Sequence, residues 1–476
     1  MNTWVNKPEP DAAPPALPLQ ADRSLRVLRP QLTTELRSVI PKGSRVLHVA
    51  CGTGDVLAAL DPSFGVGVEA DEAVRSKTAE EHASMTFYAT CEMIPRQQTF
   101  DFVLISLEVG LMDDIQGILE SLHPLCGHRT RVVVAFHNYL WAPVWRIHRA
   151  MGSVRHRPLS WLSLSDMQNL LSLSDFEVVT RARRVLLPLA IPGLSMLFNR
   201  VFARLPLVQH LCFIQIVIAR VVPPRKADHL TCSIVVPCRN ERGNIRPLLD
   251  RIPALPGRTQ VVFVEGGSSD GTLEEIHRLA EAGSYPFDIE VVKQSGKGKA
   301  NAAREGFARA TNDLIMILDA DLTVAPEQLV KFHRAAASGK ADFLMGCRLV
   351  YPLGEGAMQF ANVFGNKAFA ITLSWIIGQP IKDALCGTKV FFRSDLDRLA
   401  RSRALLHVDD PFGDFDLIFG AVHNHMLIKE IPVRYYGRQY GNTNIRRWSD
   451  GAVLLRLTLS AMRAFKFGGV ERTPSA

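Results

Sequence analysis

The chain has 476 residues, which is too long for one ordinary domain, and its 47% of hydrophobic residues suffices for two buried cores. Its 55 lysines and arginines outnumber 47 aspartates and glutamates, and this balance favours acidic partners such as phosphorylated substrates, anionic lipid or nucleic acid. The eight cysteines are scattered and form no CxxC pair or ligand-like cluster, which argues against a disulfide framework or a structural zinc site and favours reduced thiols in a cytosolic protein.

The sequence has neither a secretion-signal pattern nor a segment long enough to span a membrane. Because residues 8–18 read PEPDAAPPALP, we expect residues 1–24 to be a disordered lead-in. The uncharged apolar runs at 185–198, 205–219 and 368–381 are shorter than the ~20 residues of a transmembrane helix. We therefore expect attachment to a membrane surface rather than a span.

The first half of the chain alternates β-branched runs with helical patterns, which indicates a mainly parallel α/β sheet. Strands are predicted at 44–50, 65–70, 100–107 and 131–136, with helices between them. This order is typical of a doubly wound sheet, in which the ligand crevice lies at the carboxyl ends of the strands.

The turn after the first predicted strand is a candidate nucleoside site. In its CGTG sequence, Gly52 and Gly54 allow a sharp turn and a close approach of the ligand to the backbone. Glu69, at the end of the second strand, can accept hydrogen bonds from ribose hydroxyls. A plain strand-to-helix turn is the alternative.

This half resembles the Rossmann-type S-adenosylmethionine-dependent methyltransferases. The resemblance is carried by VLHVACGTGD (46–55), VEAD (68–71), CEMIP (91–95), FDFVLISLEVG (100–110) and SWLSLSDMQNLLSLSDFEVV (160–179). It implies S-adenosylmethionine as a cofactor, bound by Gly52, Gly54, Glu69 and Glu92. His48 and Ala50 stand where the family usually has an acidic residue and a glycine, and a scaffold without methyl transfer is the alternative.

A boundary between two domains is predicted near residue 222. Residues 221–229 read VVPPRKADH, in which two prolines and several charges precede a new β-rich run. We place a linker at 223–230, between domains at 25–222 and 231–476.

In the second domain, strands repeatedly end in polar loops, most of them bearing glycine, as in TCSIVVPCRNERG (231–243) and QVVFVEGGSSDG (260–271). The strand in DLIMILDADLTV runs into Asp319 and Asp321, which lie on one side of it if the strand stays regular. Two neighbouring carboxylates repel each other unless a cation intervenes, and Mg²⁺ or Mn²⁺ would bind them together with substrate phosphate. A solvated Asp-Ala-Asp turn is the alternative.

Residues 230–467 resemble family-2 glycosyltransferases of the GT-A fold, nearest to the dolichol-phosphate mannosyltransferase and polyprenyl-phosphate glycosyltransferase group. The matching motifs are SIVVPCRNE (233–241), EGGSSDGT (265–272), DAD (319–321), GCRLV (346–350) and DALCGTK (383–389). Three positions differ from the group's usual residues: Glu265–Gly266 replaces paired aspartates, Thr323 a glutamine, and Lys389 an arginine.

The resemblance and the late polar motifs assign roles to individual residues. Donor binding is assigned to Pro237, Arg239, Asn240, Glu241, Glu265, Asp270, Lys297, Lys299 and Asp319. Metal binding is assigned to Asp319 and Asp321, and acceptor or phosphate binding to Arg348, Asp383, Lys389 and Arg438. The catalytic candidates are Asp319, Asp321, Asp414 and Asp416, with Asp414 as the first choice for a general base.

Residues 451–467 predict an interfacial helix. Leu455, Leu459 and Met462 recur at helical spacing, and Arg456, Arg463 and Lys466 form a basic stripe that suits an anionic membrane surface. Packing of this helix against the catalytic domain is the alternative.

These features predict a two-domain α/β enzyme: a Rossmann-type, methyltransferase-like sheet followed by a GT-A domain that transfers a sugar from a nucleotide sugar to a polyprenyl-phosphate-like lipid. It is expected to use Mg²⁺ or Mn²⁺, to sit peripherally on the cytoplasmic face of the membrane and to bind no nucleic acid. One alternative is transfer to a sugar hydroxyl in glycan or polysaccharide synthesis. Another is a nucleic-acid or small-molecule methyltransferase with an accessory binding domain, and a third is a non-catalytic membrane scaffold.

Overall fold

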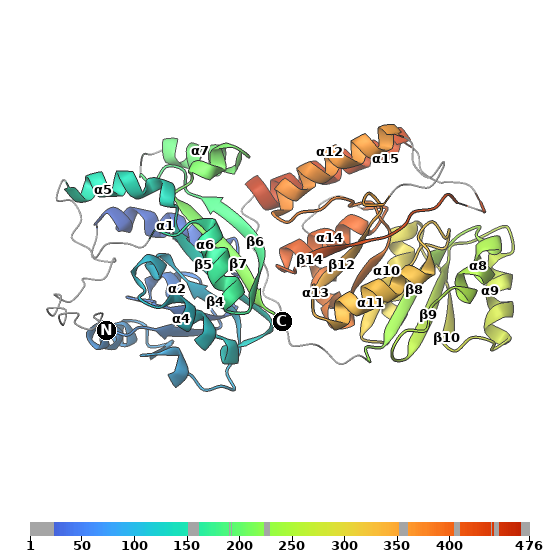
Figure 1. Ribbon diagram of the computed structural model, residues 1–476, viewed down its shortest axis with the longest axis horizontal. Helices are drawn as coiled ribbons and strands as arrows, with labels where there is room; N and C mark the ends of the chain where they lie inside the picture. Colours follow the sequence, from blue (N-terminus) through green and yellow to red (C-terminus); the bar gives the residue numbers. More distant parts are fainter. Residues whose placement is uncertain are drawn as a thin grey trace, which may run out of the picture. The chain divides into compact units, whose positions relative to one another are not determined.

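The chain is divided into two compact units (Figure 1). The computed structural model describes residues 23–150, 161–189, 191, 193–222, 229–351, 360–403, 410–438, 440–441 and 447–467. Most residues up to Ala219 belong to the first unit and most of those from Arg220 to the second. Residues 1–22 of the expected lead-in and 223–228 of the expected linker lie outside the described residues. The first helix begins at Arg23, two residues before the expected start of the domain.

The first unit contains a seven-stranded sheet in the order β3-β2-β1-β4-β5-β7-β6. Its strands are β1 (Arg45–Val49), β2 (Phe64–Val68), β3 (Thr86–Tyr88), β4 (Phe100–Ile105), β5 (Cys126–His137), β6 (Phe176–Arg184) and β7 (Ile214–Val221). Strands β1 to β5 pair in parallel, and β7 runs antiparallel to β5. The predicted doubly wound α/β sheet is confirmed.

Helices cover both faces of this sheet. They are α1 (Arg23–Arg37), α2 (Asp55–Ala59), α3 (Glu72–Glu81), α4 (Ile115–Ser121), α5 (Ala142–Ala150), α6 (Leu164–Leu173) and α7 (Leu194–Arg200). Leu28, Leu32 and Leu36 recur at helical spacing along α1 and are buried against strand residues such as Val46 and Val133. This packing fixes the sheet edge at which the loops after β1, β2 and β4 meet.

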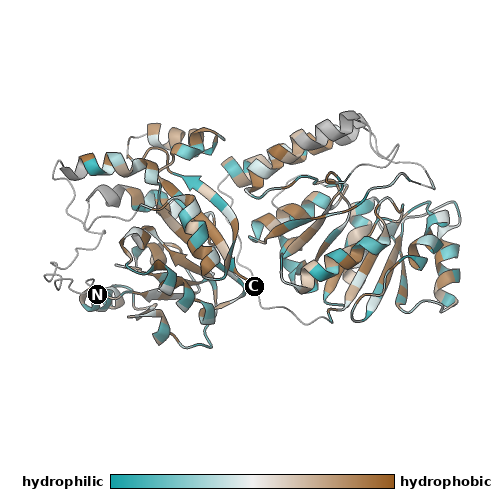
Figure 2. Ribbon diagram, in the orientation of Figure 1, coloured by the Kyte–Doolittle hydropathy of each residue, from teal (hydrophilic) through white to brown (hydrophobic). Residues whose placement is uncertain are grey.

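The second unit contains another seven-stranded sheet, in the order β10-β9-β8-β11-β13-β12-β14. Its strands are β8 (Cys232–Cys238), β9 (Thr259–Glu265), β10 (Asp288–Lys293), β11 (Leu314–Ile317), β12 (Phe343–Cys347), β13 (Lys389–Phe392) and β14 (Ile428–Pro432). The pairs among β10, β9, β8 and β11 are parallel, whereas β13 is antiparallel to β11 and β12. Figure 2 shows that the strands of both sheets are mostly hydrophobic.

Helices also cover both faces of the second sheet. They are α8 (Arg242–Asp250), α9 (Thr272–Glu281), α10 (Lys299–Arg309), α11 (Leu329–Ala337), α12 (Phe360–Ile377), α13 (Leu396–Arg401), α14 (Asp414–His423) and α15 (Arg447–Met462). Alternate residues of β8 point to opposite faces: Ile234 and Val236 pack with α8, α9 and α11, and Val235 packs with α10. Among the described helices, none has both the length and the apolar character required to cross a bilayer.

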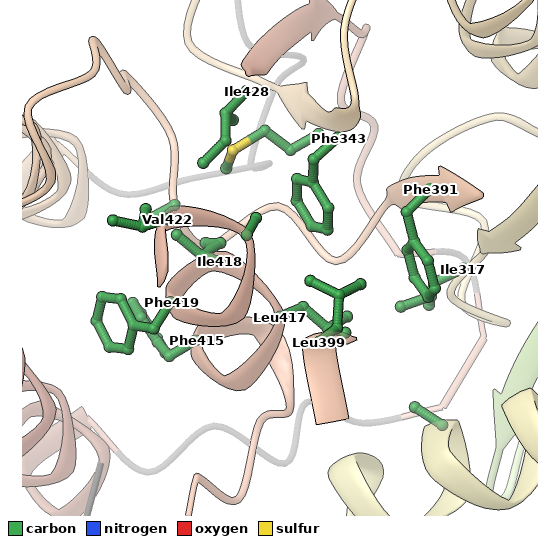
Figure 3. Packing of buried hydrophobic residues seen from close by; sticks show 14 of the residues in the cluster. Ile317, Phe343, Phe391, Leu399, Phe415, Leu417, Ile418, Phe419, Val422 and Ile428 are labelled. Atoms are coloured by element: carbon green, nitrogen blue, oxygen red, sulfur yellow. The ribbon is translucent and has the colours of Figure 1, made fainter. Parts of the chain in front are cut away.

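Helix α14 is held by apolar contacts on two sides. Figure 3 shows Ile418 beside Phe343 of β12, and Leu417 beside Leu399 of α13. On another side the rings of Phe415 and Phe419 lie 5.8 Å apart, and Phe419 contacts Phe465. Because the helix body is fixed in this way, the acidic residues at its N-terminus have a defined position.

Candidate active site

Three polar loops of the second unit lie at the same edge of its sheet. Strands β8, β9 and β11 are parallel neighbours, so their carboxyl ends lie together. The loop after β8 carries Asn240 and Glu241, the loop after β9 carries Asp270, and the loop after β11 carries Asp319 and Asp321. The sequence therefore predicted the position of this edge from the strand ends alone.

The third of these loops corrects one expectation. The two aspartates were expected to lie on one side on the condition that the strand stays regular through them, and this condition fails, because β11 ends at Ile317 and Leu322 has a φ of 58°. The carboxylate of Asp321 accepts hydrogen bonds from the backbone N–H and hydroxyl of Thr323, at 3.1 and 2.7 Å. Such local bonding competes with strand pairing, so the aspartates occupy a turn.

Asp319 lies beside a lysine. The Lys299 ammonium is 2.5 Å from Asp319 Oδ1, and α10 positions this lysine at its first residue. Burial is the largest single influence and raises the pKa of Asp319, but the charge and hydrogen bond of Lys299, together with neighbouring cations, hold this pKa below its usual value. Lys389 and Arg348 contribute to the same lowering, so these cations belong to the surroundings of Asp319.

Gly387 also contacts the Asp319 carboxylate, a contact that the sequence did not reveal. A Cβ on Gly387 would lie 2.1 Å from Asp319 Oδ2 and 2.6 Å from Lys299 Nζ, so the carboxylate would have to move. We expect Gly387→Ala to lower sugar transfer by about 100-fold, since a shift of about 1 Å in a reacting group can cost that much. Steady-state rates measure this effect.

The control for this prediction is Gly451→Ala, because among the described residues outside the helix's own backbone no atom lies within 4 Å of a Cβ at Gly451. That variant should transfer sugar as the unaltered protein does. Unchanged transfer by Gly387→Ala would contradict the placement of Asp319 in the reacting site.

Arg438 connects two of the polar loops. Its guanidinium lies 3.0 Å from Glu241 Oε1 and 3.0 Å from Asp321 Oδ2. Burial raises the pKa of Glu241, and Arg438 opposes this shift. Arg438 was assigned to the acceptor phosphate from sequence; here it lies against two residues that were assigned to the donor and the metal.

The loops after β8 and β9 are bonded to each other. Asn240 has a φ of 57°; its backbone N–H donates to Ser268 Oγ (2.8 Å), and its side-chain oxygen accepts from the N–H of Ser269 (2.9 Å). Asp270 accepts bonds from the backbone N–H of Arg242 (3.1 Å) and from the Tyr440 hydroxyl (3.2 Å). The two loops therefore form one preorganised wall.

The remaining donor-site candidates differ in exposure. Glu265 is buried and accepts a bond from the backbone N–H of Ser268 at 2.5 Å. Pro237 is half-buried, whereas Arg239 and Lys297 are exposed to solvent. Glu265 thus has a defined place in the wall, while the two basic side chains flank it.

The acceptor and base candidates are held in ion pairs. Arg348 forms a two-pronged contact with Asp383, in which Nε and Nη2 each lie 2.7 Å from a carboxylate oxygen, and both side chains are buried. Lys389 Nζ lies 2.7 Å from Asp414 Oδ1, and Lys389 is fully buried.

Asp416, the second base candidate, is also paired. Its Oδ2 lies 3.4 Å from Arg304 Nη1 and 3.4 Å from Arg403 Nε. Asp410, a residue without an assigned role, accepts bonds from the backbone N–H groups of Phe415 and Asp416 at the start of α14. The DPFG sequence that begins at Asp410 is the signal for such a helix start.

In the first unit, the glycine turn keeps an unusual backbone. Ala50 has a φ of 53°, Gly52 of 54° and Gly54 of 70°. Glu69 accepts hydrogen bonds from the backbone N–H groups of Gly52 (2.9 Å) and Asp71 (3.1 Å), which ties the first loop to the second. The left-handed conformation is energetically costly for alanine. Ala50 nevertheless adopts it, at the position where the resembled family usually has a glycine.

Glu92 and His48, the other two positions singled out in this unit, differ in their burial. Glu92 is exposed, and a hydrogen bond from Thr90 lowers its pKa. His48 is buried in β1, where its Nε2 lies 2.8 Å from Ser106 Oγ. Burial lowers the pKa of His48 from 6.5 to about 3, so its imidazole is neutral where the resembled family usually has a carboxylate.

This histidine predicts a pH dependence of stability. Between pH 6.5 and about 3 the unfolded chain binds a proton at this position that the folded chain does not, so stability falls as the pH is lowered. Replacing His48 with Gln should remove about 1.4 kcal/mol per pH unit from that slope. Burial also lowers the pKa of His137 to about 4, so this residue adds a similar loss of stability at low pH, and that loss remains in His48→Gln.

Denaturant unfolding at several pH values measures this slope. The exposed His210 provides the control, because His210→Gln should leave the slope unaltered. An identical slope in His48→Gln and the unaltered protein would contradict the burial of a neutral imidazole.

Two family models match the chain. Glycosyl transferase family 2 matches residues 233–407, and methionine biosynthesis protein MetW matches residues 31–192. The predicted resemblances of the two halves are thereby confirmed as a family-2 glycosyltransferase domain and a MetW-type, methyltransferase-like domain.

Several relatives match the second unit. Glycosyltransferase AglJ of Haloferax volcanii is 30% identical over 50% of this chain and 75% of its own length. Dolichol-phosphate mannosyltransferase of Mycosarcoma maydis is 30% identical over 50% of this chain and 81% of its own length. The enzyme of the same name from Saccharomyces cerevisiae is 35% identical, but the match spans only 22% of this chain and 40% of the yeast enzyme.

Two solved structures are similar in fold to part of the chain. The plantazolicin methyltransferase BpumL has a TM-score of 0.30 and 16% identity, with 42% of this chain and 86% of BpumL covered. An S-adenosylmethionine-dependent methyltransferase from Mesorhizobium loti has a TM-score of 0.30 and 15% identity, with 40% and 97% covered.

Proposed function

The chain belongs to glycosyl transferase family 2, and from this membership we propose that its second unit transfers a sugar from a nucleotide sugar to the phosphate of a polyprenyl-phosphate-like lipid. The names of its relatives support this class of acceptor, since they include dolichol-phosphate mannosyltransferases and a polyprenol monophosphomannose synthase. The reaction forms a bond between the anomeric carbon of the sugar and an acceptor oxygen, and a nucleoside diphosphate departs.

The ion pair between Lys389 and Asp414 is the observation that favours a phosphate over a hydroxyl as acceptor. A sugar hydroxyl needs a carboxylate that can take its proton, worth roughly 10² to 10⁴ in rate. Asp414 is buried against an ammonium group, and Asp416 lies beside two guanidinium groups, so a hydroxyl acceptor would have to displace these cations before either carboxylate could take its proton. A lipid phosphate is already ionised near neutral pH and needs no such base.

We assign the donor nucleotide to the wall formed by the loops after β8 and β9. Glu265 and Asp270 offer carboxylate oxygens to base and ribose, and Asn240 and Glu241 hold the loops in register. The exposed cations Arg239 and Lys297 flank this wall and can attract the diphosphate. Lys299 is more buried than these two cations and lies beside Asp319.

The donor set of the loop after β11 fits a divalent cation. Asp319 and Asp321 supply two carboxylates, and Mg²⁺ usually takes one or two carboxylates together with water and substrate phosphate. Among the described residues, no group of three or more His, Cys, Asp or Glu side chains is placed to hold a metal, so donor phosphate would complete the site. When bound, Mg²⁺ or Mn²⁺ would stabilise the charge developing on the departing diphosphate.

Arg438 is the cation that we assign to the acceptor phosphate, because it is only half-buried and lies beside Asp321. Replacing Arg438 with Ala should lower kcat/KM for the acceptor by about 10- to 150-fold, the loss of about 1.5–3 kcal/mol for a hydrogen bond to a charged group. Acceptor titrations at saturating donor measure this effect. Arg438→Lys should recover part of the loss.

Arg434→Ala is the matched control, since Arg434 is an exposed arginine of the same segment. It should leave acceptor kinetics unchanged. An Arg438→Ala effect confined to the donor KM would move Arg438 from the acceptor to the donor site.

We also assign contact with a membrane surface to α15. Leu455 and Leu459 are 61% and 51% exposed, whereas Leu457 and Ala461 on another face of the helix are buried in the second unit. The helix thus uses one face for packing and leaves leucines for lipid, with Arg456 and Arg463 exposed beside them. Packing against the catalytic domain and contact with a membrane surface, the two alternatives for this helix, are therefore compatible.

The experiment for this function is an assay of the purified protein with a panel of nucleotide sugars, Mg²⁺ or Mn²⁺, and a lipid extract. Labelled sugar should appear in the lipid fraction, and mild acid should release it as expected for a phosphodiester. Labelled polysaccharide with an unlabelled lipid fraction would favour the hydroxyl acceptor.

A second function is favoured by the backbone of the glycine turn in the first unit. Three alternate left-handed positions, Ala50, Gly52 and Gly54, shape this turn, and Glu69 directly follows β2 and accepts a hydrogen bond from the N–H of Gly52. We propose that this turn binds S-adenosylmethionine. Calorimetry on the whole chain should detect binding that Gly52→Val abolishes; absence of binding at millimolar cofactor would favour a scaffold, with His48 as the suspected cause.

A further inference from the structure

The first unit exposes many large apolar side chains on one part of its surface. We call this the apolar patch: the exposed apolar residues of 139–147, which include the start of α5, and of the described part of 189–211, which includes α7. The exposed fraction reaches 60% at Ile147, 65% at Met196 and 85% at Leu207. Soluble monomers rarely expose a contiguous apolar area of this kind without an interaction partner.

The two segments of the apolar patch are bonded to each other. The Asn138 side-chain amide donates to the backbone oxygens of His210 (2.9 Å) and Cys212 (2.8 Å). The Trp141 indole N–H donates to the backbone oxygen of Leu211 (2.9 Å), and its ring contacts Phe213 of the strand-side core. These bonds join residues 138–141 to residues 210–212, so the two segments of the patch are held to each other on the first unit.

Polar side chains of the second segment point inward. Ser195 is 8% exposed, accepts a bond from the backbone N–H of Ile191 and donates to the backbone oxygen of Leu189. Asn199 bonds both the N–H (2.7 Å) and the oxygen (3.0 Å) of Leu187. Backbone groups are thus satisfied from inside while leucine and methionine side chains face outward, which reverses the arrangement of a water-facing helix.

The sequence stretches that supply the apolar patch contain basic residues but no acidic ones. No Asp or Glu occurs between Glu120 and Asp166, or between Glu177 and Asp228, and these two stretches supply the whole apolar patch. Arg146 on α5 and Arg200 on α7 are exposed beside its apolar residues. The two segments of the patch therefore carry cations and no carboxylates, and the Glu35 carboxylate of α1 that reaches the second segment is paired with Arg204 at 2.9 Å. Such segments complement an anionic lipid surface, where Trp and Tyr such as Trp141 and Tyr139 are also favoured.

We propose that the apolar patch of the first unit is a docking surface for an anionic lipid bilayer, separate from α15 of the second unit. We assign a membrane rather than a protein as the occupant, because these stretches combine exposed apolar side chains with arginines and contain no carboxylate, which complements anionic lipid headgroups. The side chains insert to the depth of the headgroup boundary, since no described helix is able to span. The first unit thereby anchors the chain where a lipid substrate resides.

Vesicle flotation of the whole chain tests this inference. Vesicles of phosphatidylcholine with phosphatidylglycerol should bind the protein, and vesicles of phosphatidylcholine alone should bind it several-fold less. The test variant is Met196→Glu with Leu207→Glu, which should lower the ratio of bound to free protein by at least ~10-fold, because inserted apolar area sets the binding. Raising the salt concentration should weaken binding further.

The matched control is Met93→Glu with Leu173→Glu. These residues are 60% and 58% exposed on the same unit and lie outside the apolar patch, so the same two residue types gain the same charges. Binding of this control should stay within about twofold of the unaltered protein. Equal losses in the test and control variants would overturn the proposal, as would unchanged binding in the test variant.

Other occupants give different results. If a second copy of the chain covers the patch, light scattering will show a dimer that the test variant dissociates, with no change in vesicle binding. If α15 alone attaches the protein, Leu455→Glu with Leu459→Glu will abolish flotation and the test variant will not. Either result overturns the proposal. Sugar transfer to a detergent-solubilised acceptor should be normal in the test variant, which separates this proposal from the proposed function.

Discussion

Asp321→Asn should lower sugar transfer by roughly 10³-fold while the protein stays folded, because stabilisation of phosphate charge by a metal is worth several kcal/mol. The asparagine oxygen can still accept the hydrogen bonds from Thr323 that shape the turn. The variant loses one of two negative charges that would hold a divalent cation, and it also loses the ion pair of that charge with Arg438. Initial rates over a range of Mg²⁺ and Mn²⁺ concentrations measure the loss, with circular dichroism as the check on folding.

Asp397→Asn is the control for this prediction. Asp397 is an exposed carboxylate on α13 of the same unit, and its loss should not alter transfer. Full activity of Asp321→Asn in the presence of a chelator would refute the assignment of a metal to this loop.

The buried pair of Lys389 and Asp414 gives the second large effect. Replacing either partner alone, as in Lys389→Met or Asp414→Asn, should destabilise the second unit by about 3–5 kcal/mol, because an uncompensated charge or polar group stays buried. The double variant Lys389→Met with Asp414→Asn should recover most of that stability. Denaturant unfolding of all three variants, analysed as a double-mutant cycle, measures the coupling.

Activity of the double variant separates structure from catalysis. If Asp414 only fixes the start of α14 and the strand end at Lys389, the double variant keeps transfer within about tenfold of Lys389→Met alone, assayed where both are folded. If Asp414 is the base of a hydroxyl-using enzyme, the double variant regains stability but loses roughly 10² to 10⁴ in rate. The second outcome would promote the hydroxyl acceptor.

The sequence predicted the elements that follow a periodic pattern. The apolar runs before Asn240, Asp270 and Asp319 are buried strands, and the polar residues after them meet at one edge because parallel neighbouring strands end together. The end of β11 was missed, since an apolar run does not show where local bonding by Asp321 and Thr323 replaces strand pairing.

Contacts between distant segments could not be derived from the sequence. Arg438 lies beside Glu241 and Asp321, which are 197 and 117 positions away, and no local pattern encodes that meeting. The burial of Lys389 against Asp414 is likewise a contact between separate segments that no local sequence pattern encodes. Sequence reasoning placed both residues near the site, but only packing of β13 against α14 shows that each already has an ionic partner.

The nature of the acceptor is the central claim, and a paired-acceptor assay tests it most directly. The purified protein is given one labelled nucleotide sugar and either a polyprenyl phosphate or the polyprenol of the same chain length, which lacks only the phosphate. We predict labelled lipid from the polyprenyl phosphate and none from the polyprenol, with Arg438→Ala reducing the signal. Equal labelling of the polyprenol, or labelling of a glycan hydroxyl with an unlabelled polyprenyl phosphate, would contradict it.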